Sequence, residues 1–201
     1  MKEQQPRVLS DRKGFALDDS GDWFVGAEVL PSPNCDERPP AAEISLAIVH
    51  GISLPPGQFG GPNIAQLFTN QLDWNEHYFF REIKGLRVSS HLLIERSGAL
   101  TQFVPLSRRA WHAGQSEYCG EQRCNDFSVG IELEGTDHVP YTAAQYHALA
   151  GVLTTLMVRY PRITRARIVG HCDVAPKRKT DPGASFRWDS LYALLGASES
   201  L

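Results

Sequence analysis

Two histidines stand where short apolar runs end, which is a place where metal ligands are often found. His50 ends the run Ile44–Val49, and His171 follows the run Ile168–Gly170, where we expect the strand to open into a loop. Both runs are apolar enough to be buried strands. Ligands gather at the ends of adjacent strands in sheets of this kind, so we expect the two imidazoles to lie close together.

Asp181 supplies a third candidate ligand, and Lys179 accompanies it. Asp181 precedes Pro182, which favours an extended backbone, so residues two apart should project the same way. Two imidazoles and one carboxylate suit catalytic zinc, which keeps a fourth position open for water. The metal lowers the pKa of that water to about 7, a nearby carboxylate accepts the proton, and Lys179 stabilises the oxyanion. Together these groups describe amide hydrolysis.

A structural interpretation of the same residues stays open. A histidine taken alone is more often a hydrogen-bonded residue of the core, and Lys177–Lys179 is more often a solvated run of charge. No His-Glu-x-x-His helix is present to fix the ligand set. The spacing therefore does not choose between the zinc site and a structural role.

The segment Val129–Gly135 alternates between apolar and acidic residues, so Glu132 and Glu134 share one face of a strand. The plain interpretation is a half-buried strand with its acids in water. The alternation does not say which of the two acids would act as a base. A loop at Trp111–Gly114 is equally open: it lines a pocket, or its Trp and His112 simply pack in the core.

Amphipathic helices and apolar strands alternate along the chain. We expect a helix with Pro62 in its first turn, a long helix opened by Thr142 and stopped by Pro161, and a last helix from Trp188 to near Gly196. Residues 87–95 and 99–104 predict a hairpin, and Tyr78–Phe80 is expected in the core. The pattern indicates an α/β fold with a central mixed β-sheet and helices on both faces.

Composition limits the classes of function. The chain has 201 residues with 42% hydrophobic and 21% charged content, which suits one domain over 25–201 preceded by an extension over 1–24. A net charge of -3 argues against a nucleic-acid partner. The amino terminus lacks an apolar signal core and no stretch could span a bilayer, so we expect a cytoplasmic, monomeric protein without a membrane partner. The four cysteines should be free thiols, with a Cys119–Cys124 bridge as the main exception.

Four stretches closely resemble a known family: His50–Gly61, Arg109–Gly114, Cys124–Asp137 and Gly170–Gly183. In this order they are similar to the AmpD family, the bacterial 1,6-anhydro-N-acetylmuramyl-L-alanine amidases of peptidoglycan recycling. The resemblance runs from about Val29 to the last helix. It implies the fold of peptidoglycan-recognition proteins and type 2 amidases, one zinc ion, and an anhydromuropeptide cut between its lactyl group and L-alanine.

The resemblance also assigns roles to particular residues. It matches the zinc ligands to His50, His171 and Asp181, the general base to Glu132 and the oxyanion-stabilising residue to Lys179. It further matches substrate contacts to Arg87, Trp111 and Arg123. One position departs from the family, which usually has Asn after the first ligand where this chain has Gly51. We expect this departure to remove an amide that would hydrogen-bond the substrate.

Two other functions share these residues. A non-catalytic muropeptide sensor would bind without cleaving, although such proteins typically lack one zinc ligand. An amidase acting on the polymeric wall would use the same chemistry but would need export.

Overall fold

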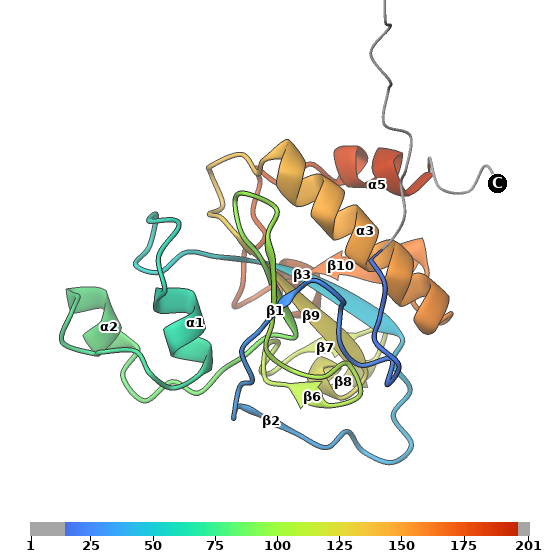
Figure 1. Ribbon diagram of the computed structural model, residues 1–201, viewed down its shortest axis with the longest axis horizontal. Helices are drawn as coiled ribbons and strands as arrows, with labels where there is room; N and C mark the ends of the chain where they lie inside the picture. Colours follow the sequence, from blue (N-terminus) through green and yellow to red (C-terminus); the bar gives the residue numbers. More distant parts are fainter. Residues whose placement is uncertain (1–14, 197–201) are drawn as a thin grey trace, which may run out of the picture.

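A computed structural model describes residues 15–196 (Figure 1). The strands are β1 (Glu28–Val29), β2 (Cys35–Asp36), β3 (Leu46–Ile52), β4 (Leu92–Ile94), β5 (Leu100–Gln102), β6 (Arg109–Ala110), β7 (Glu117–Tyr118), β8 (Glu121–Gln122), β9 (Ser128–Glu134) and β10 (Ile168–Gly170). The helices are α1 (Asn63–Phe68), α2 (Tyr78–Glu82), α3 (Ala143–Arg159), α4 (His171–Val174) and α5 (Trp188–Gly196), with 3-10 turns η1 (Cys124–Asp126) and η2 (Arg165–Arg167).

One six-stranded mixed sheet organises the molecule, in the order β1-β5-β4-β9-β3-β10. Only the hairpin pair β4 and β5 runs antiparallel, while β4, β9, β3 and β10 are mutually parallel. The long strands β3 and β9 lie in the middle, and their apolar side chains bury both faces. The predicted fold class, including the hairpin, is confirmed.

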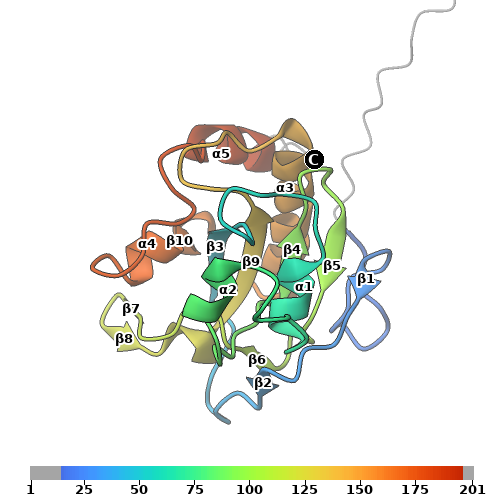
Figure 2. The ribbon, with the colours of Figure 1, turned by 90° about the vertical axis from the view of Figure 1, so that its left-hand side faces the viewer.

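Helices cover both faces of this sheet. Val49 of β3 and Ile131 of β9 belong to the same core as residues of α3 and α5. On the other face, Leu93 of β4 packs with residues of α1 and α2, which stand in front of the sheet in Figure 2. His50, Glu132 and Leu93 are register partners in neighbouring parallel strands, so they project towards this second face.

Three expectations about local structure were wrong. His50 does not end its strand, because pairing with β9 continues to Ile52. His171 opens the one-turn helix α4 rather than a loop. Glu132 and Glu134 are not in water: they are only 8% and 3% exposed, because β9 is central and covered on both faces.

The start of α3, the aromatic cluster and the cysteines can each be compared with their predictions from the sequence. α3 starts after Thr142, whose hydroxyl accepts from the backbone of Gln145 while the Gln145 side chain accepts from Thr142, as the capping box predicted. Phe80 is fully buried, but Tyr78 is 69% exposed, so the prediction that Tyr78 lies in the core was wrong. All four cysteines are free thiols, as expected.

The start of the described chain packs on the domain. Phe24 is 2% exposed within the core, and the carbonyl of Phe15 accepts a hydrogen bond from Thr155 of α3 at 2.6 Å. We therefore propose that the domain begins near residue 15 instead of 25; the rest of the predicted extension lies outside the described residues. No helix over 15–196 has the length and apolar character needed to cross a membrane.

Candidate metal centre and active site

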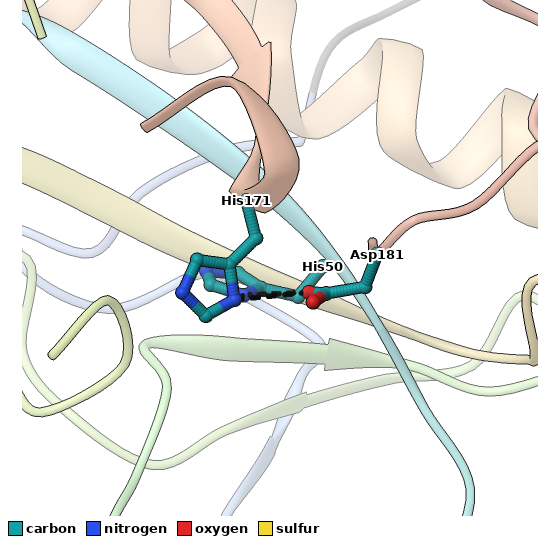
Figure 3. Close-up of side chains that lie close together, drawn as sticks. All are labelled: His50, His171 and Asp181. Carbon is teal, nitrogen blue, oxygen red and sulfur yellow. Dashed lines mark hydrogen bonds and ion pairs between the residues drawn. The ribbon is translucent and has the colours of Figure 1, made fainter. Parts of the chain in front are cut away.

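His50, His171 and Asp181 come together at the end of the sheet (Figure 3). Parallel pairing of β10 with β3 sets Gly170 beside Val49, so the next residues, His171 and His50, stand level with each other. Asp181 reaches the same point from the segment after α4. Its backbone carbonyl accepts a hydrogen bond from the Cys172 amide at 3.0 Å, which ties that segment to the start of α4.

The three side chains present one atom each to a common point. The Nδ1 atoms of His50 and His171 are 3.0 Å apart, and Oδ2 of Asp181 lies 3.2 Å and 3.1 Å from them respectively. Ligands placed tetrahedrally about 2.0–2.1 Å from zinc stand roughly 3.3 Å from one another. The triangle therefore has the dimensions of one face of a zinc site.

The outer ring nitrogen of His171 fixes which nitrogen carries the proton. Nε2 of His171 lies 3.2 Å from the carbonyl oxygen of Ala113, which only accepts hydrogen bonds. Nε2 must therefore carry the hydrogen. In the neutral ring, Nδ1 then holds a lone pair aimed at the triangle.

His50 is fixed in the same way through a longer chain. The Ser128 hydroxyl donates to the Cys124 carbonyl at 2.6 Å, so it accepts from Nε2–H of His112 at 3.1 Å. Nδ1 of His112 is then an acceptor, and it accepts a hydrogen bond of 2.9 Å from Nε2–H of His50. This leaves the lone pair of His50 Nδ1 pointing at the triangle. Burial lowers the pKa of His50 to about 4, which keeps the ring neutral near pH 7.

Nδ1 of His50, Nδ1 of His171 and Oδ2 of Asp181 thus meet as three hydrogen-bond acceptors, with no hydrogen between them. Burial alone would raise the pKa of Asp181, so the carboxylate needs a positive charge at the point where it meets the two imidazoles. Two lone pairs and one anionic oxygen at hydrogen-bond distance repel one another unless a cation lies among them, so the donor set fits a divalent metal.

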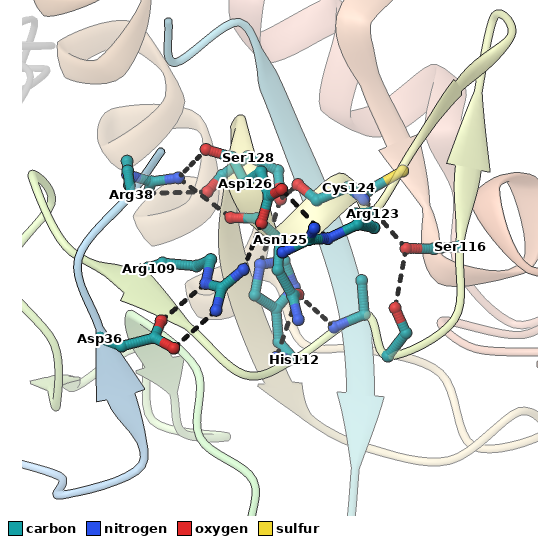
Figure 4. A network of polar contacts seen from close by, with 12 residues as sticks. Asp36, Arg38, Arg109, His112, Ser116, Arg123, Cys124, Asn125, Asp126 and Ser128 are labelled. Atoms are coloured by element: carbon teal, nitrogen blue, oxygen red, sulfur yellow. Dashed lines mark hydrogen bonds and ion pairs between the residues drawn. The ribbon is translucent and has the colours of Figure 1, made fainter. Parts of the chain in front are cut away.

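A network of polar contacts holds His112 in place (Figure 4). The side-chain oxygen of Asn125 accepts from the backbone amides of His112 and Ala113 at 3.3 Å and 2.8 Å. The His112 ring lies against Gly130 of β9 so closely that a Cβ there would come within 2.5 Å of it. The sequence left the role of His112 open, and Ser128 and Asn125 carried no signal at all, because their parts depend on which strands and turns are neighbours.

Glu132 and Lys179 line the same cavity as the triad, which has a volume of about 450 Å³. Oε1 of Glu132 is 3.9 Å from Nδ1 of His50, and its buried Oε2 has no hydrogen-bond partner among the described residues. Burial and then the charge of Asp181 raise the pKa of Glu132 well above its usual value, while Lys179 opposes the rise. A basic carboxylate and an ammonium group therefore face the metal-binding triangle.

The three predicted substrate contacts do not line this cavity among the described residues. Arg87 is exposed, between Leu86 and Val88, which do line it. Trp111 is half-buried. Its backbone amide donates to the hydroxyl of Ser89, another residue of the cavity wall, and its carbonyl accepts from the Ser89 amide.

Arg123 borders a second cavity of about 620 Å³, together with Lys177 and Arg178. Its side chain is 69% exposed and pairs with Asp126 at 3.3 Å.

The structure shows what lies against Gly51. Its backbone borders the cavity, but a Cβ at this position would collide with the hydroxyl of Tyr141 and approach Pro182 to 3.5 Å. A side chain at position 51 would therefore require the Tyr141 hydroxyl to move.

The fold and the site together define a class of protein. A mixed β-sheet presents a His-His-Asp triangle, a buried carboxylate and a lysine at one cavity. These are the groups that a metal-dependent amide hydrolase requires. Comparison with known families identifies the chain within this class. It belongs to the N-acetylmuramoyl-L-alanine amidase family, whose sequence model matches residues 40–184.

Similar proteins agree with this membership. The 1,6-anhydro-N-acetylmuramyl-L-alanine amidase AmpD of Escherichia coli (strain K12) is 57% identical over 173 residues, covering 86% of this chain and 94% of the relative. AmpD of Salmonella typhimurium (strain SL1344) is 55% identical over 182 residues, covering 90% and 96%.

Solved structures show the same likeness in three dimensions. The crystal structure of a selenomethionine AmpD derivative matches with a TM-score of 0.84 at 55% identity, covering 86% of this chain and 96% of that one. The amidase AmiD from Escherichia coli, in complex with anhydro-N-acetylmuramic acid-L-Ala-D-gamma-Glu-L-Lys, matches with a TM-score of 0.55 at 29% identity, covering 79% and 60%. The resemblance seen in the sequence is thereby confirmed.

Proposed function

We propose that this chain hydrolyses the amide bond between 1,6-anhydro-N-acetylmuramic acid and L-alanine in anhydromuropeptides, with one zinc ion held by His50, His171 and Asp181. The observation that carries the proposal is the convergence of three proton-free acceptor atoms within 3.0–3.2 Å. The names of the AmpD relatives support the choice of bond, and the AmiD complex supports a soluble fragment as substrate. A bound zinc ion supplies Lewis-acid polarisation of the carbonyl and acidifies water.

Glu132 accepts the proton of the attacking water in this proposal. Its raised pKa makes it a stronger base than an exposed glutamate, and its unpartnered Oε2 leaves an oxygen free for that water. The same carboxyl group then returns the proton to the departing amine of L-alanine. Lys179, on the same cavity, donates to the oxygen that becomes negatively charged at the attacked carbonyl.

The remaining substrate contacts are proposed from the surroundings of the cavity. An apolar wall that includes Leu54, Phe68 and Ile83 suits the methyl groups of the lactyl and acetamido substituents. Arg87 and Trp111 flank this wall, and an indole suits a sugar face. Arg123 stands with Lys177 and Arg178 on the neighbouring cavity, where cationic groups suit peptide carboxylates.

We also propose that the protein acts as a cytoplasmic monomer. Four free thiols suit a reducing compartment. Cell fractionation and light scattering, with 22.3 kDa expected for the monomer, measure these two properties.

Zinc content and turnover, measured on one preparation, test the function. Purified protein should contain one zinc per chain and release the peptide from soluble anhydromuropeptide. A chelator should abolish turnover, and zinc should restore it. Asp181→Asn, which keeps the shape but removes the charge, should lose both zinc and activity.

Two outcomes would favour the rival functions. Zinc-loaded protein that binds anhydromuropeptide without cleaving it would indicate a sensor. Faster release of peptide from intact sacculi than from the soluble fragment would indicate an amidase of the polymeric wall.

A further inference from the structure

Tyr141 connects the strand ends to the segment that carries Asp181. It is 6% exposed, and its hydroxyl donates a hydrogen bond of 2.9 Å to the carbonyl of Pro182, the residue after Asp181. Burial, then the nearby carboxylates of Glu132 and Asp181, raise the pKa of Tyr141, so the hydroxyl keeps the proton that it donates.

Two glycines make room for this side chain. Gly51 lies in β3 next to His50, and a Cβ there would collide with the Tyr141 hydroxyl. Gly135 directly follows β9 and donates to the carbonyl of Ile52 at 2.8 Å; a Cβ there would collide with the Tyr141 ring. The ring therefore lies across the ends of both central strands, against two positions that carry no side chain.

The peptide unit beside Asp181 is held from two sides. The Asp181 carbonyl accepts a hydrogen bond from the amide of Cys172, which follows His171. The Pro182 carbonyl accepts from the hydroxyl of Tyr141, which packs on Gly51, the residue after His50. The third ligand is thus connected to the backbone of each of the other two. Losing the tyrosine hydroxyl would free one of these connections and leave the ring in place.

We propose that Tyr141 is a positioning residue that sets Asp181 against the two histidines, and that Gly51 provides the space its hydroxyl requires. The inference rests on the metal centre of the proposed function. It also gives this chain's Gly51 a part in holding the metal, where the sequence suggested only a lost substrate contact. Hydrogen bonds that orient metal ligands typically change metal affinity 10–100-fold when they are lost.

Tyr146 offers a matched control. It is 7% exposed, contacts the same Phe186 ring as Tyr141, and its hydroxyl also bonds the backbone of the last segment, accepting from the Arg187 amide at 2.6 Å. Arg187 lies beyond the ligand. Tyr146→Phe therefore removes an equivalent buried hydroxyl without touching the segment at Asp181.

The experiment measures the zinc dissociation constant of the full chain by competition with a chromogenic chelator. Tyr141→Phe should weaken zinc binding about tenfold, whereas Tyr146→Phe should stay within twofold of the wild type. At limiting zinc the Tyr141→Phe enzyme should lose turnover, and excess zinc should restore it. A hydroxyl that only stabilises the fold would lower the melting temperature of the zinc-free protein without this rescue.

Gly51→Ala gives an independent variant, because it keeps Tyr141 and displaces its hydroxyl. It should also weaken zinc binding, and the double variant should be no weaker than Tyr141→Phe alone. A zinc dissociation constant for Tyr141→Phe within twofold of the wild type would overturn the inference, and so would full additivity of the two changes. Failure of the wild type to bind zinc would instead refute the proposed function.

Discussion

Glu132 is distinguished from its neighbour on the same strand face by what each carboxylate touches. Glu134 accepts hydrogen bonds from the backbone amides of Gly60 and Arg96, which anchor the loop after β3 and the turn between β4 and β5. Glu132 makes no such bond at Oε2 and faces the cavity of the triad. The free oxygen, rather than burial, separates a group available for chemistry from one used for structure.

Glu132→Gln should abolish proton transfer while keeping the shape of the side chain. We expect kcat to fall about 10²–10⁴-fold with zinc content unchanged, since general base catalysis contributes that much. Steady-state kinetics and metal analysis of the same sample measure both. Glu134→Gln is the control and should keep kcat within about fivefold; equal losses in the two variants would contradict the assignment.

Lys179 should act on the transition state and not on the metal. Lys179→Met should lower kcat about 10²–10³-fold and leave the zinc dissociation constant unchanged, because its ammonium stabilises charge that develops only during reaction. Lys177→Met removes the same charge from an exposed position two residues earlier and should preserve kcat, with any loss of its proposed carboxylate contact appearing in KM. An active Lys179→Met enzyme would be incompatible with the role in oxyanion stabilisation.

At the scale of elements, parallel register explains how distant residues meet. β3 and β9 pair from Leu46↔Ser128 to Ile52↔Glu134, which sets Glu132 directly beside His50. A shift of β9 by one residue would turn Glu132 to the opposite face, away from His50 and into the apolar core beneath α3. The buried apolar pattern of the two strands therefore protects the geometry of the site.

The cap of α3 connects that helix to the sheet. Besides capping the helix, the Thr142 hydroxyl donates to the Arg96 carbonyl at 2.8 Å. The side-chain amide of Gln145 donates to the backbone carbonyl of Glu134 at 2.9 Å. Thr142→Ala should lower the free energy of unfolding by about 1–2 kcal/mol without changing zinc affinity. Urea denaturation of the zinc-free protein tests this. Thr142→Ser keeps the hydroxyl and should retain most of the stability; a similar loss in both variants would rule out the cap as the cause.

The whole molecule encloses a group of uncharged histidines. Burial lowers the pKa of His50 to about 4 and that of His91 to about 3, the latter with help from the Arg38 guanidinium, and it lowers the pKa of His112 well below the usual value. Their unfolded pKa is about 6.5. The unfolded chain therefore binds more protons than the folded chain between pH 6.5 and about 4.

Stability should fall on acidification through this window. The contribution of neutral histidines is fully present above pH 6.5 and is lost as the pH falls, by up to about 1.4 kcal/mol per pH unit for each group. The raised pKa of Glu132 acts in the opposite direction and offsets the contribution of one histidine, so the net slope is up to roughly 3 kcal/mol per pH unit. Denaturation of the zinc-free protein between pH 7.5 and 5 measures the slope. The exposed His138 provides a control, since His138→Gln should leave the slope unchanged; equal stability at pH 7.5 and 5 would contradict the prediction.

Much of this protein was determined locally and could be predicted from its sequence. The capping box at Thr142, the hairpin around residues 96–98 and the alternating apolar residues of β9 depend on near neighbours, and each was predicted correctly. The two apolar runs before the histidines also predicted that His50 and His171 would lie close together. Local signals suffice there because helix caps and strand faces are set by spacing along the chain.

Only the tertiary structure decided the rest. Nothing near Glu132 in the sequence distinguishes it from Glu134, nor shows that both are buried, because both facts follow from which elements cover the middle of the sheet. The tautomer of His50 depends on His112 and Ser128, brought in from other segments. That Gly51 leaves space for the Tyr141 hydroxyl is visible only in the folded chain. Such relations arise from contacts between residues far apart in sequence, and strand register and packing alone determine them.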